Sequence, residues 1–333
     1  MYANNQPIII GTPLREKREE EDVDVDSSLR FGFRLVCSTA LYPLEYAKTL
    51  IQLGYEPIAP RPGRTLFGAR RLMLPNIFQY AAYIKSVDGF TGCFRGLSAR
   101  LLGNVLGSYY GERLAIALLS KPPKTVLQPD FFEFGVEMWE KYDFNEPRPV
   151  FKADIVSKAV TQVCGIVISH PFHVISIRMM AQFIGREHLY DGLFGSIKEI
   201  WVQEGIRGFF SGLIPRLWME ACCMALTTAI SYLFKKYSGA NKTICGHVDT
   251  ISHFTVTSML YPYHVVSTCM AVQGCRLKAG NPPFMDHFIS WRHCHAHLTL
   301  QNQHKRGSSF FFRTVARAPG KINDAFAPYP EMK

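Results

Sequence analysis

Long apolar segments recur along the chain after residue 30, and they set the predicted architecture. They lie near residues 31–51, 98–119, 154–183, 213–234 and 248–272. The third is free of Asp, Glu, Lys and Arg from Ala159 to Ile177, and the fifth from Thr250 to Cys275. The hydrocarbon core of a bilayer takes about 20 residues of helix, and these two charge-free runs approach or exceed that length, whereas the other three segments carry charges within the span. We therefore expect an all-α membrane protein with five spanning helices; a soluble protein with buried helices is the alternative.

A sequence motif recurs in the loops between these segments. It reads acid-Gly-x4-Phe-x-Gly, it occurs at residues 88–96 and 204–212, and a degenerate third copy begins at residue 306. The motif glycines are Gly89, Gly205 and Gly307, and the prolines that precede them inside apolar segments are Pro43, Pro171 and Pro262. Three copies of one unit of about 100 residues are a repeat architecture, which must be recognised before any fold is assigned.

The repeat sets the domain boundaries. We expect repeat 1 at 31–120, a linker at 121–153, repeat 2 at 154–237, a truncated repeat 3 at 246–313 and a tail at 314–333. Residues 1–30 hold a charged run that cannot bury enough apolar surface to offset its ordering entropy, so we predict a disordered acidic tail there. Residues 276–305 are expected to form an amphipathic helix at the membrane interface.

This repeat resembles the mitochondrial carrier family, whose triplicated signature is Pro-x-acid-x-x-base, a short helix, then acid-Gly-x4-aromatic-base-Gly. Within that family the chain looks most like the divergent mitochondrial carrier homologue branch, on residues 53–57, 170–175, 182–187 and 212–217. The resemblance implies a threefold helical bundle and a multi-pass protein of the outer mitochondrial membrane. It also implies insertion of tail-anchored and related α-helical membrane proteins, lipid scrambling and a link to apoptotic regulators.

The chain departs from the carrier signature at the positions that would close a cavity. The signature places an acid two residues after each proline and a base five residues after it. The first repeat keeps Glu45 and Lys48, but the other repeats have His173 and His264 at the acid position and serines at the base position. A gate needs an interaction that differs between its open and closed states. We therefore expect no ring of ion pairs and no alternating access.

A second departure lies after Phe312, where charged residues and prolines leave no room for a sixth spanning helix. Five helices in place of six are expected to leave the bundle open sideways to lipid, between its first and fifth helices. Polar residues in membrane segments usually face such an interior, because charge in hydrocarbon is costly. The candidate groove residues are Glu45, Lys48, Lys158, Gln162, His173, Arg216, Glu220 and His264.

Some of these residues also have simpler interpretations. Arg216 and Glu220 are four apart on one helical face, so they either line the groove or neutralise each other locally. The two histidines are either groove residues or neutral, hydrogen-bonded side chains. The glycines Gly103, Gly107 and Gly111 share one face and predict close helix packing, within this chain or between two copies.

Composition and known motifs exclude several other classes. The chain has 47% hydrophobic and 19% charged residues, with a net charge of +10, but no nucleic-acid module accompanies the charge. It has no C-x-x-C pair, P-loop or nucleophile motif, so we expect no enzyme activity, no cofactor and no metal. The histidines at 293, 295 and 297 lack a second ligand cluster.

The function predicted from these observations is an insertase that acts through a polar groove open to lipid. Its expected partners are membrane lipids, the hydrophobic helices of client proteins and apoptotic regulators, but not nucleic acid. Two alternatives stay open: a small-solute carrier of the mitochondrial inner membrane, and a receptor or scaffold for apoptotic or metabolic partners.

Overall fold

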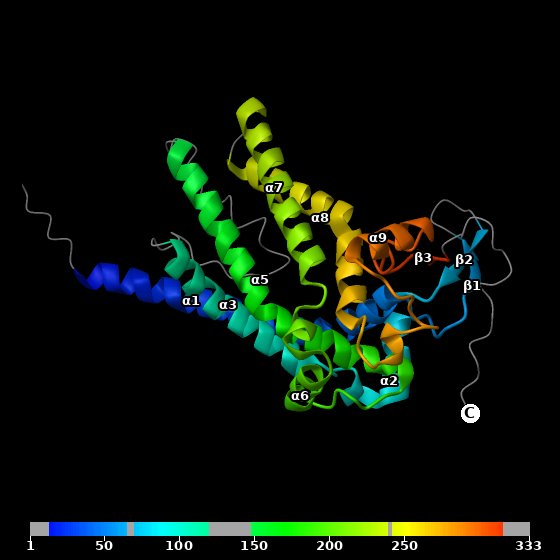
Figure 1. Cartoon of the computed structure of the whole chain (residues 1–333). Coiled ribbons are helices and arrows are strands. Elements are labelled where there is room, and N and C mark those ends of the chain that lie inside the picture. The colour runs from blue at the N-terminus through cyan, green and yellow to red at the C-terminus, as the bar shows by residue number, and fades with distance from the viewer. Residues whose placement is uncertain (1–12, 65–69, 120–147, 239–241, 316–333) are drawn as a thin grey trace, which may run out of the picture. The chain divides into compact units, whose positions relative to one another are not determined.

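The computed structural model is helical along most of its length (Figure 1), as the sequence predicted. It describes residues 13–64, 70–119, 148–238 and 242–315. The long helices are α1 (Pro13–Leu53), α3 (Leu97–Leu119), α5 (Arg148–Gly185), α7 (Leu213–Ser238) and α8 (Lys242–Val272). The short helices are α2 (Ile77–Gly92), α6 (Leu193–Glu204) and α9 (Trp291–Leu300), with 3-10 turns η1 (Gly205–Phe210) and η2 (Lys278–Gly280). The strands are β1 (Arg61–Arg64), β2 (Arg70–Leu74) and β3 (Arg313–Thr314).

The order of the helices repeats along the chain. A long helix with an internal proline is followed by a short helix and by a second long helix, first as α1, α2 and α3, then as α5, α6 and α7. The proline-containing α8 and the short α9 form the first two members of a third copy. The helix predicted within residues 276–305 is therefore present as α9, the counterpart of α2 and α6.

The three motif glycines all have a positive φ angle. The φ angle is 75° at Gly89, 64° at Gly205 and 77° at Gly307, all in the left-handed region that a side chain disfavours. Arg306 replaces the acid that precedes the glycine in the other two copies. The third copy is thus degenerate in sequence but keeps the turn of the first two.

Small residues allow α3 and α5 to lie close together. Gly103, Gly107 and Gly111 are all buried on one face of α3. A Cβ atom added to Gly111 would lie 2.7 Å from the Cα of Gly165, and one added to Gly107 would lie 2.9 Å from the Cβ of Ser169. Both contacts are closer than carbon atoms tolerate, and both are made within the chain. The glycine face therefore packs α3 against α5.

The helices α7 and α8 pack through a small apolar cluster. Its buried members are Met219, Cys223, Val256 and Leu260. Near the start of α7, the hydroxyl of Ser267 in α8 donates to the carbonyl of Gly212 over 2.8 Å. Ser267 occupies the base position of the third signature copy, so at this position a neutral hydrogen bond stands where a carrier would place a charge.

A small antiparallel sheet, with strand order β1-β2-β3, joins the first repeat to the end of the third. Met73 lies opposite Arg61 of β1 and opposite Thr314 of β3. The buried Arg313 donates to the carbonyl of Pro75 over 2.9 Å and forms an ion pair with Glu56, three residues beyond α1. The sequence analysis predicted no sheet, because its strands are short and rich in arginine.

Two predicted boundaries differ from the structure. The predicted disordered tail at 1–30 is helical from Pro13 onward, because α1 begins there. Glu, Arg and Lys are good helix formers, and proline is favoured at the first helical position, so the run suits a helix despite its polarity. The predicted linker at 121–153 overlaps α5, which begins at Arg148; residues 121–147 lie outside the described residues.

The chain divides into two units, Met1–Tyr42 and Pro43–Lys333, and all contacts discussed below lie within the second. Two described stretches are long and apolar enough to cross a membrane, Ile155–Gly185 and Gly192–Phe234. The helices α1, α3 and α8 occupy the other predicted segments, but the first two carry charges and α8 is rich in Ser, Thr and His.

The predicted number of five spans is therefore still a prediction. The described residues from 301 to 315 contain β3 and no helix. Residues 316–333, where the sequence predicted that no sixth span would fit, lie outside the described part of the chain.

Candidate functional site

The eight candidate groove residues lie on four of the long helices, α1, α5, α7 and α8. Each of them is partly exposed, and none is buried or fully exposed. The contacts below divide most of them into three groups.

The first group is centred on Arg100 of α3. Its Nη2 atom lies 2.5 Å from Oε1 of Glu45, and its Nη1 atom lies 2.7 Å from Nδ1 of His173. A guanidinium has donors only, so the Nδ1 atom of His173 must accept, which requires a neutral ring with its proton on Nε2. The side chains of Arg100 and Glu45 are 25% and 29% exposed, so the pair is not sealed from solvent.

A second arginine and histidine pair lies beside the first. Nη1 of Arg216 lies 3.4 Å from Nδ1 of His170, and the Nε2 atom of His170 donates to the carbonyl of Ser211 over 3.0 Å. The same donor rule makes His170 neutral. The rings of His170 and His173, on neighbouring turns of α5, have centroids 6.0 Å apart. Two arginines and two neutral histidines therefore gather where α3, α5 and α7 meet.

The second group is a pair in which Glu220 of α7 has its partner on another helix, α5. The side-chain amide of Gln162 in α5 donates to Oε2 of Glu220 over 2.9 Å. Arg216 also contacts His170, and Glu220 also accepts from Gln162, both on α5. Local neutralisation of Arg216 by Glu220 therefore does not account for all their contacts. Lys158 lies one helical turn before Gln162 and is partly exposed.

The third group joins α1 to α8 through Gln52. The Nε2 atom of Gln52 donates to the hydroxyl of Tyr261 over 2.8 Å and lies 3.3 Å from Nδ1 of His264. The hydroxyl of Thr268 donates to Oε1 of Gln52 over 3.1 Å. The ammonium of Lys48 lies over the Tyr261 ring, 5.4 Å from its centroid. Lys48 and His264 are thus brought together by a neutral amide and an aromatic ring, not by an acid.

Sequence reasoning missed two residues that hold these groups together, and each had a signal. Arg100 lies four residues after Gly96, the last glycine of the first motif, as Arg216 lies four residues after Gly212. Gln52 lies four residues after Lys48, hence on the same face of α1.

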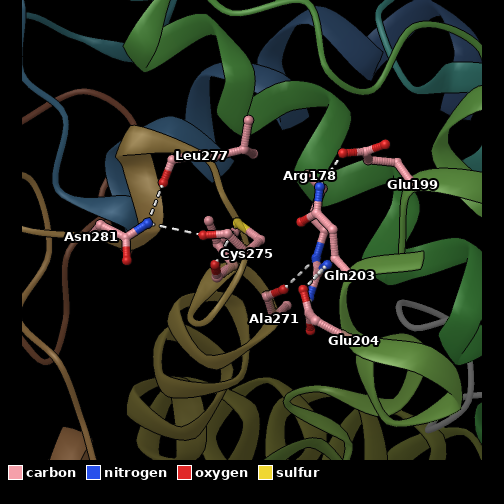
Figure 2. Close-up of polar contacts among 9 residues, drawn as sticks. Arg178, Glu199, Gln203, Glu204, Ala271, Cys275, Leu277 and Asn281 are labelled. Carbon is pink, nitrogen blue, oxygen red and sulfur yellow. Dashed lines mark hydrogen bonds and ion pairs between the residues drawn. The ribbon is translucent and has the colours of Figure 1, made fainter. Parts of the chain in front are cut away.

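Arg178 near the end of α5 has a different role. Figure 2 shows its guanidinium between Glu204, the acid of the second motif, and the backbone of Ala271 in α8. Nη1 and Nη2 donate to the two carboxylate oxygens of Glu204 over 2.6 and 2.9 Å, and Nε donates to the Ala271 carbonyl over 3.0 Å. The arginine is fully buried. It ties α5, α6 and α8 together and does not line the polar groups described above.

The same long helices also expose large apolar side chains. They include Tyr109, Leu114 and Leu118 of α3, Trp218 and Leu226 of α7, and Phe254 and Met259 of α8. Exposed apolar side chains on spanning helices are what a lipid-facing surface requires. Within the described residues, no group of three His, Cys, Asp or Glu side chains is arranged to hold a metal ion.

Comparison with known proteins bears on the family. A family model described as "Mitochondrial carrier protein" matches residues 149–242. Mitochondrial carrier homolog 2 of Mus musculus is 38% identical over 280 residues, which cover 82% of this chain and 89% of the mouse protein. The Homo sapiens homolog 2 is 37% identical over 278 residues, with the same shares of 82% and 89%. Mitochondrial carrier homolog 1 of Mus musculus is 35% identical over 302 residues, 84% of this chain and 74% of that protein. Together with the repeated helices and glycine turns, these matches show that the chain belongs to the mitochondrial carrier family, among the mitochondrial carrier homologs.

Proposed function

We propose that this mitochondrial membrane protein inserts α-helical membrane proteins, tail-anchored proteins among them, into the outer mitochondrial membrane. The observation that carries the proposal is the partly exposed polar set that joins α3, α5 and α7, Arg100 with His173 and Gln162 with Glu220. It lies on helices whose other exposed side chains are largely apolar. A polar strip between apolar surfaces suits a client that has one hydrophilic end and one hydrophobic helix.

The physical task of an insertase is to lower the barrier for the hydrophilic end. A charged group at the bilayer centre costs about 2.5–3.5 kcal/mol on insertion scales. Water and hydrogen-bonding side chains along a groove would keep that group solvated while the apolar helix of the client moves into lipid. No covalent step is needed, and phospholipid headgroups could follow the same path, so we include lipid scrambling as a side activity.

The contacts at the signature positions support an insertase over a solute carrier. In the described residues, Glu45 pairs with Arg100 of its own repeat, and Ser267 bonds to the backbone. His264 is held by the neutral Gln52. Alternating access needs a set of interactions that forms in one state and breaks in the other. Hydrogen bonds between neutral groups give a weaker latch than charged pairs do, so a permanently open groove fits these residues better.

Insertion by the purified full-length protein tests the proposal. Proteoliposomes that contain the protein are given a tail-anchored substrate, and the rate of insertion is measured as protection of its C-terminal tag from protease. Glu220→Arg places a cation next to Arg216 and should change the rate about fivefold, given roughly 1 kcal/mol of altered electrostatic energy. Asp191→Arg is the matched control, because it changes the charge by the same amount at a side chain that is 65% exposed and belongs to none of these groups.

Each rival predicts a different result. A solute carrier would exchange a small solute across the proteoliposome membrane, and such counterflow without insertion would refute the proposal. A receptor or scaffold would recruit apoptotic or metabolic partners without inserting the substrate. In that case the wild type and Glu220→Arg would both insert it no faster than liposomes without protein. Insertion that depends on the protein but is unchanged in Glu220→Arg would remove the polar set from the mechanism.

A further inference from the structure

The hairpin of β1 and β2 carries exposed positive charge outside the polar groups of the bundle. Arg61, Arg64 and Arg71 are all exposed. Residues 57–76, which contain the hairpin, include four arginines and no Asp or Glu. In the part of the chain that the structure describes, no carboxylate forms an ion pair with these three arginines. Their charge is therefore available to a partner.

Exposed aromatic side chains lie just beyond the end of β2. Phe78, at the start of α2, is 50% exposed, and its ring lies 5.8 Å from that of Phe311, which is 61% exposed. Phe312, next along the chain, is 50% exposed. The amide of Ile77 donates to the carbonyl of Phe310 over 3.0 Å, so these aromatic residues are held beside the end of β2. In the register of the hairpin, Arg61 and Arg71 lie on one face, and Arg64 and the exposed Leu72 lie on the other, so both faces are exposed and each carries positive charge.

The surface is fixed to the helices and not merely appended to them. Arg313 of β3 is 7% exposed, and it binds Glu56 and the carbonyl of Pro75. The hairpin begins eight residues after Leu53, the last residue of α1. It ends two residues before Asn76, which caps α2. Arg313 is thus used for structure, while Arg61, Arg64 and Arg71 are exposed.

We infer that the basic hairpin, with Arg61, Arg64 and Arg71 on its two faces, and the neighbouring Phe78 and Phe311 bind the anionic headgroup layer of the membrane that holds the protein. The arginines match the charge of anionic lipids. Aromatic rings prefer the boundary between headgroups and hydrocarbon, and so they suit the same depth. The surface acts as a second lipid contact beside the bundle, and it does not depend on whether the protein inserts clients.

The expected effect follows from the charge. Each basic residue near an anionic surface raises the affinity about fivefold, so neutralising all three should lower it roughly 100-fold at low salt. Salt screens charges that lie more than about 10 Å apart at 0.1 M, so the preference should also weaken as salt is added. Apolar contacts through the phenylalanines do not distinguish headgroups.

Native mass spectrometry of the full-length protein in neutral detergent tests the inference, with phosphatidylglycerol and phosphatidylcholine as the probes. Arg61→Gln, Arg64→Gln and Arg71→Gln are combined in one variant. The control combines Lys198→Gln, Lys236→Gln and Arg292→Gln, three exposed residues on α6, α7 and α9 that lose the same charge. The wild type and the control should prefer phosphatidylglycerol, whereas the hairpin variant should lose most of that preference.

Three results would overturn the inference. The hairpin variant could keep the preference of the wild type, or the control could lose it equally, which would reduce the effect to net charge. Alternatively, a glutamate-rich peptide could depend on the three arginines while lipid binding does not, and the surface would then serve an acidic protein. Unchanged melting temperatures of both variants show that the protein is still folded.

Discussion

Replacement of Arg178 by methionine should destabilise the protein more than any change to an exposed charge. Methionine keeps much of the volume of the side chain but removes three hydrogen bonds, two to Glu204 and one to the carbonyl of Ala271. Removing one partner of a buried ion pair typically costs 3–5 kcal/mol. The side chain of Glu204 is 18% exposed, so water can recover part of its solvation. We therefore expect a loss of about 3 kcal/mol.

The melting temperature of the purified protein in one detergent measures this loss. For a domain of 150–250 residues, 1 kcal/mol corresponds to about 2–4 °C, so the melting temperature of Arg178→Met should fall by roughly 6–12 °C. Arg186→Met is the matched control. Arg186 lies 3.7 Å from Asp88 in an ion pair whose arginine is 43% exposed, and such pairs are worth at most about 1 kcal/mol.

A double variant separates the lost pair from the lost packing. Arg178→Met with Glu204→Leu leaves no unpaired carboxylate, so it should recover part of the stability that Arg178→Met loses. The reasoning fails if Arg178→Met melts within about 2 °C of the wild type. It also fails if the double variant is as unstable as the sum of the two single changes, because the two side chains would then not interact.

Three further predictions concern packing, pH and the sheet. Gly111→Ala should cost about 1–3 kcal/mol of stability, because its Cβ meets the backbone of α5. Gly195→Ala, with nothing within 4 Å of its Cβ, should gain up to about 1 kcal/mol. Chemical denaturation measures both free energies of unfolding, and a change of the same sign in the two variants would refute the argument. Burial raises the pKa of Tyr190 from 10.0 to about 12. Between these pH values the unfolded chain releases the proton and the folded protein keeps it, so the free energy of unfolding should fall as the pH rises from 10 to 12. Denaturation at several pH values should show a smaller fall for Tyr190→Phe. Arg313→Gln should leave Glu56 without its cation and speed hydrogen exchange in β1 and β2 but not in α5; unchanged exchange in the strands would show that the ion pair does not hold the sheet.

The features that sequence reasoning found are those with a period or a motif. The apolar segments predicted the long helices, and the copies around Gly89 and Gly205 predicted two matching repeats. Both follow from constraints that act on many residues at once. Even the degenerate copy around Gly307 keeps its turn, because a glycine in the left-handed region is a local requirement.

The features that sequence reasoning missed depend on contacts between distant residues. The sheet joins residues 73 and 314, and its strands of two to five residues carry no alternation that would separate them from a loop. Arg100 reads as one charge at the start of an apolar segment, and only the packing of α3 on α5 brings it to His173. The polarity of residues 13–30 suggests a disordered tail, but their Glu, Arg and Lys side chains are also good helix formers, and the helix propensity decides the structure there.

The pairing of β2 with β3 sets an order for assembly. The first two strands lie next to each other in the sequence and can form a hairpin early, whereas β3 is translated about 240 residues after β2. Until Arg313 has been made, the outer edge of β2 offers unpaired backbone groups, and Glu56 has no cation. Contacts of such long sequence separation form late. A nascent chain of this protein therefore carries an unpaired sheet edge for most of its synthesis. That edge can pair only after β3, at the end of the third repeat, has been translated.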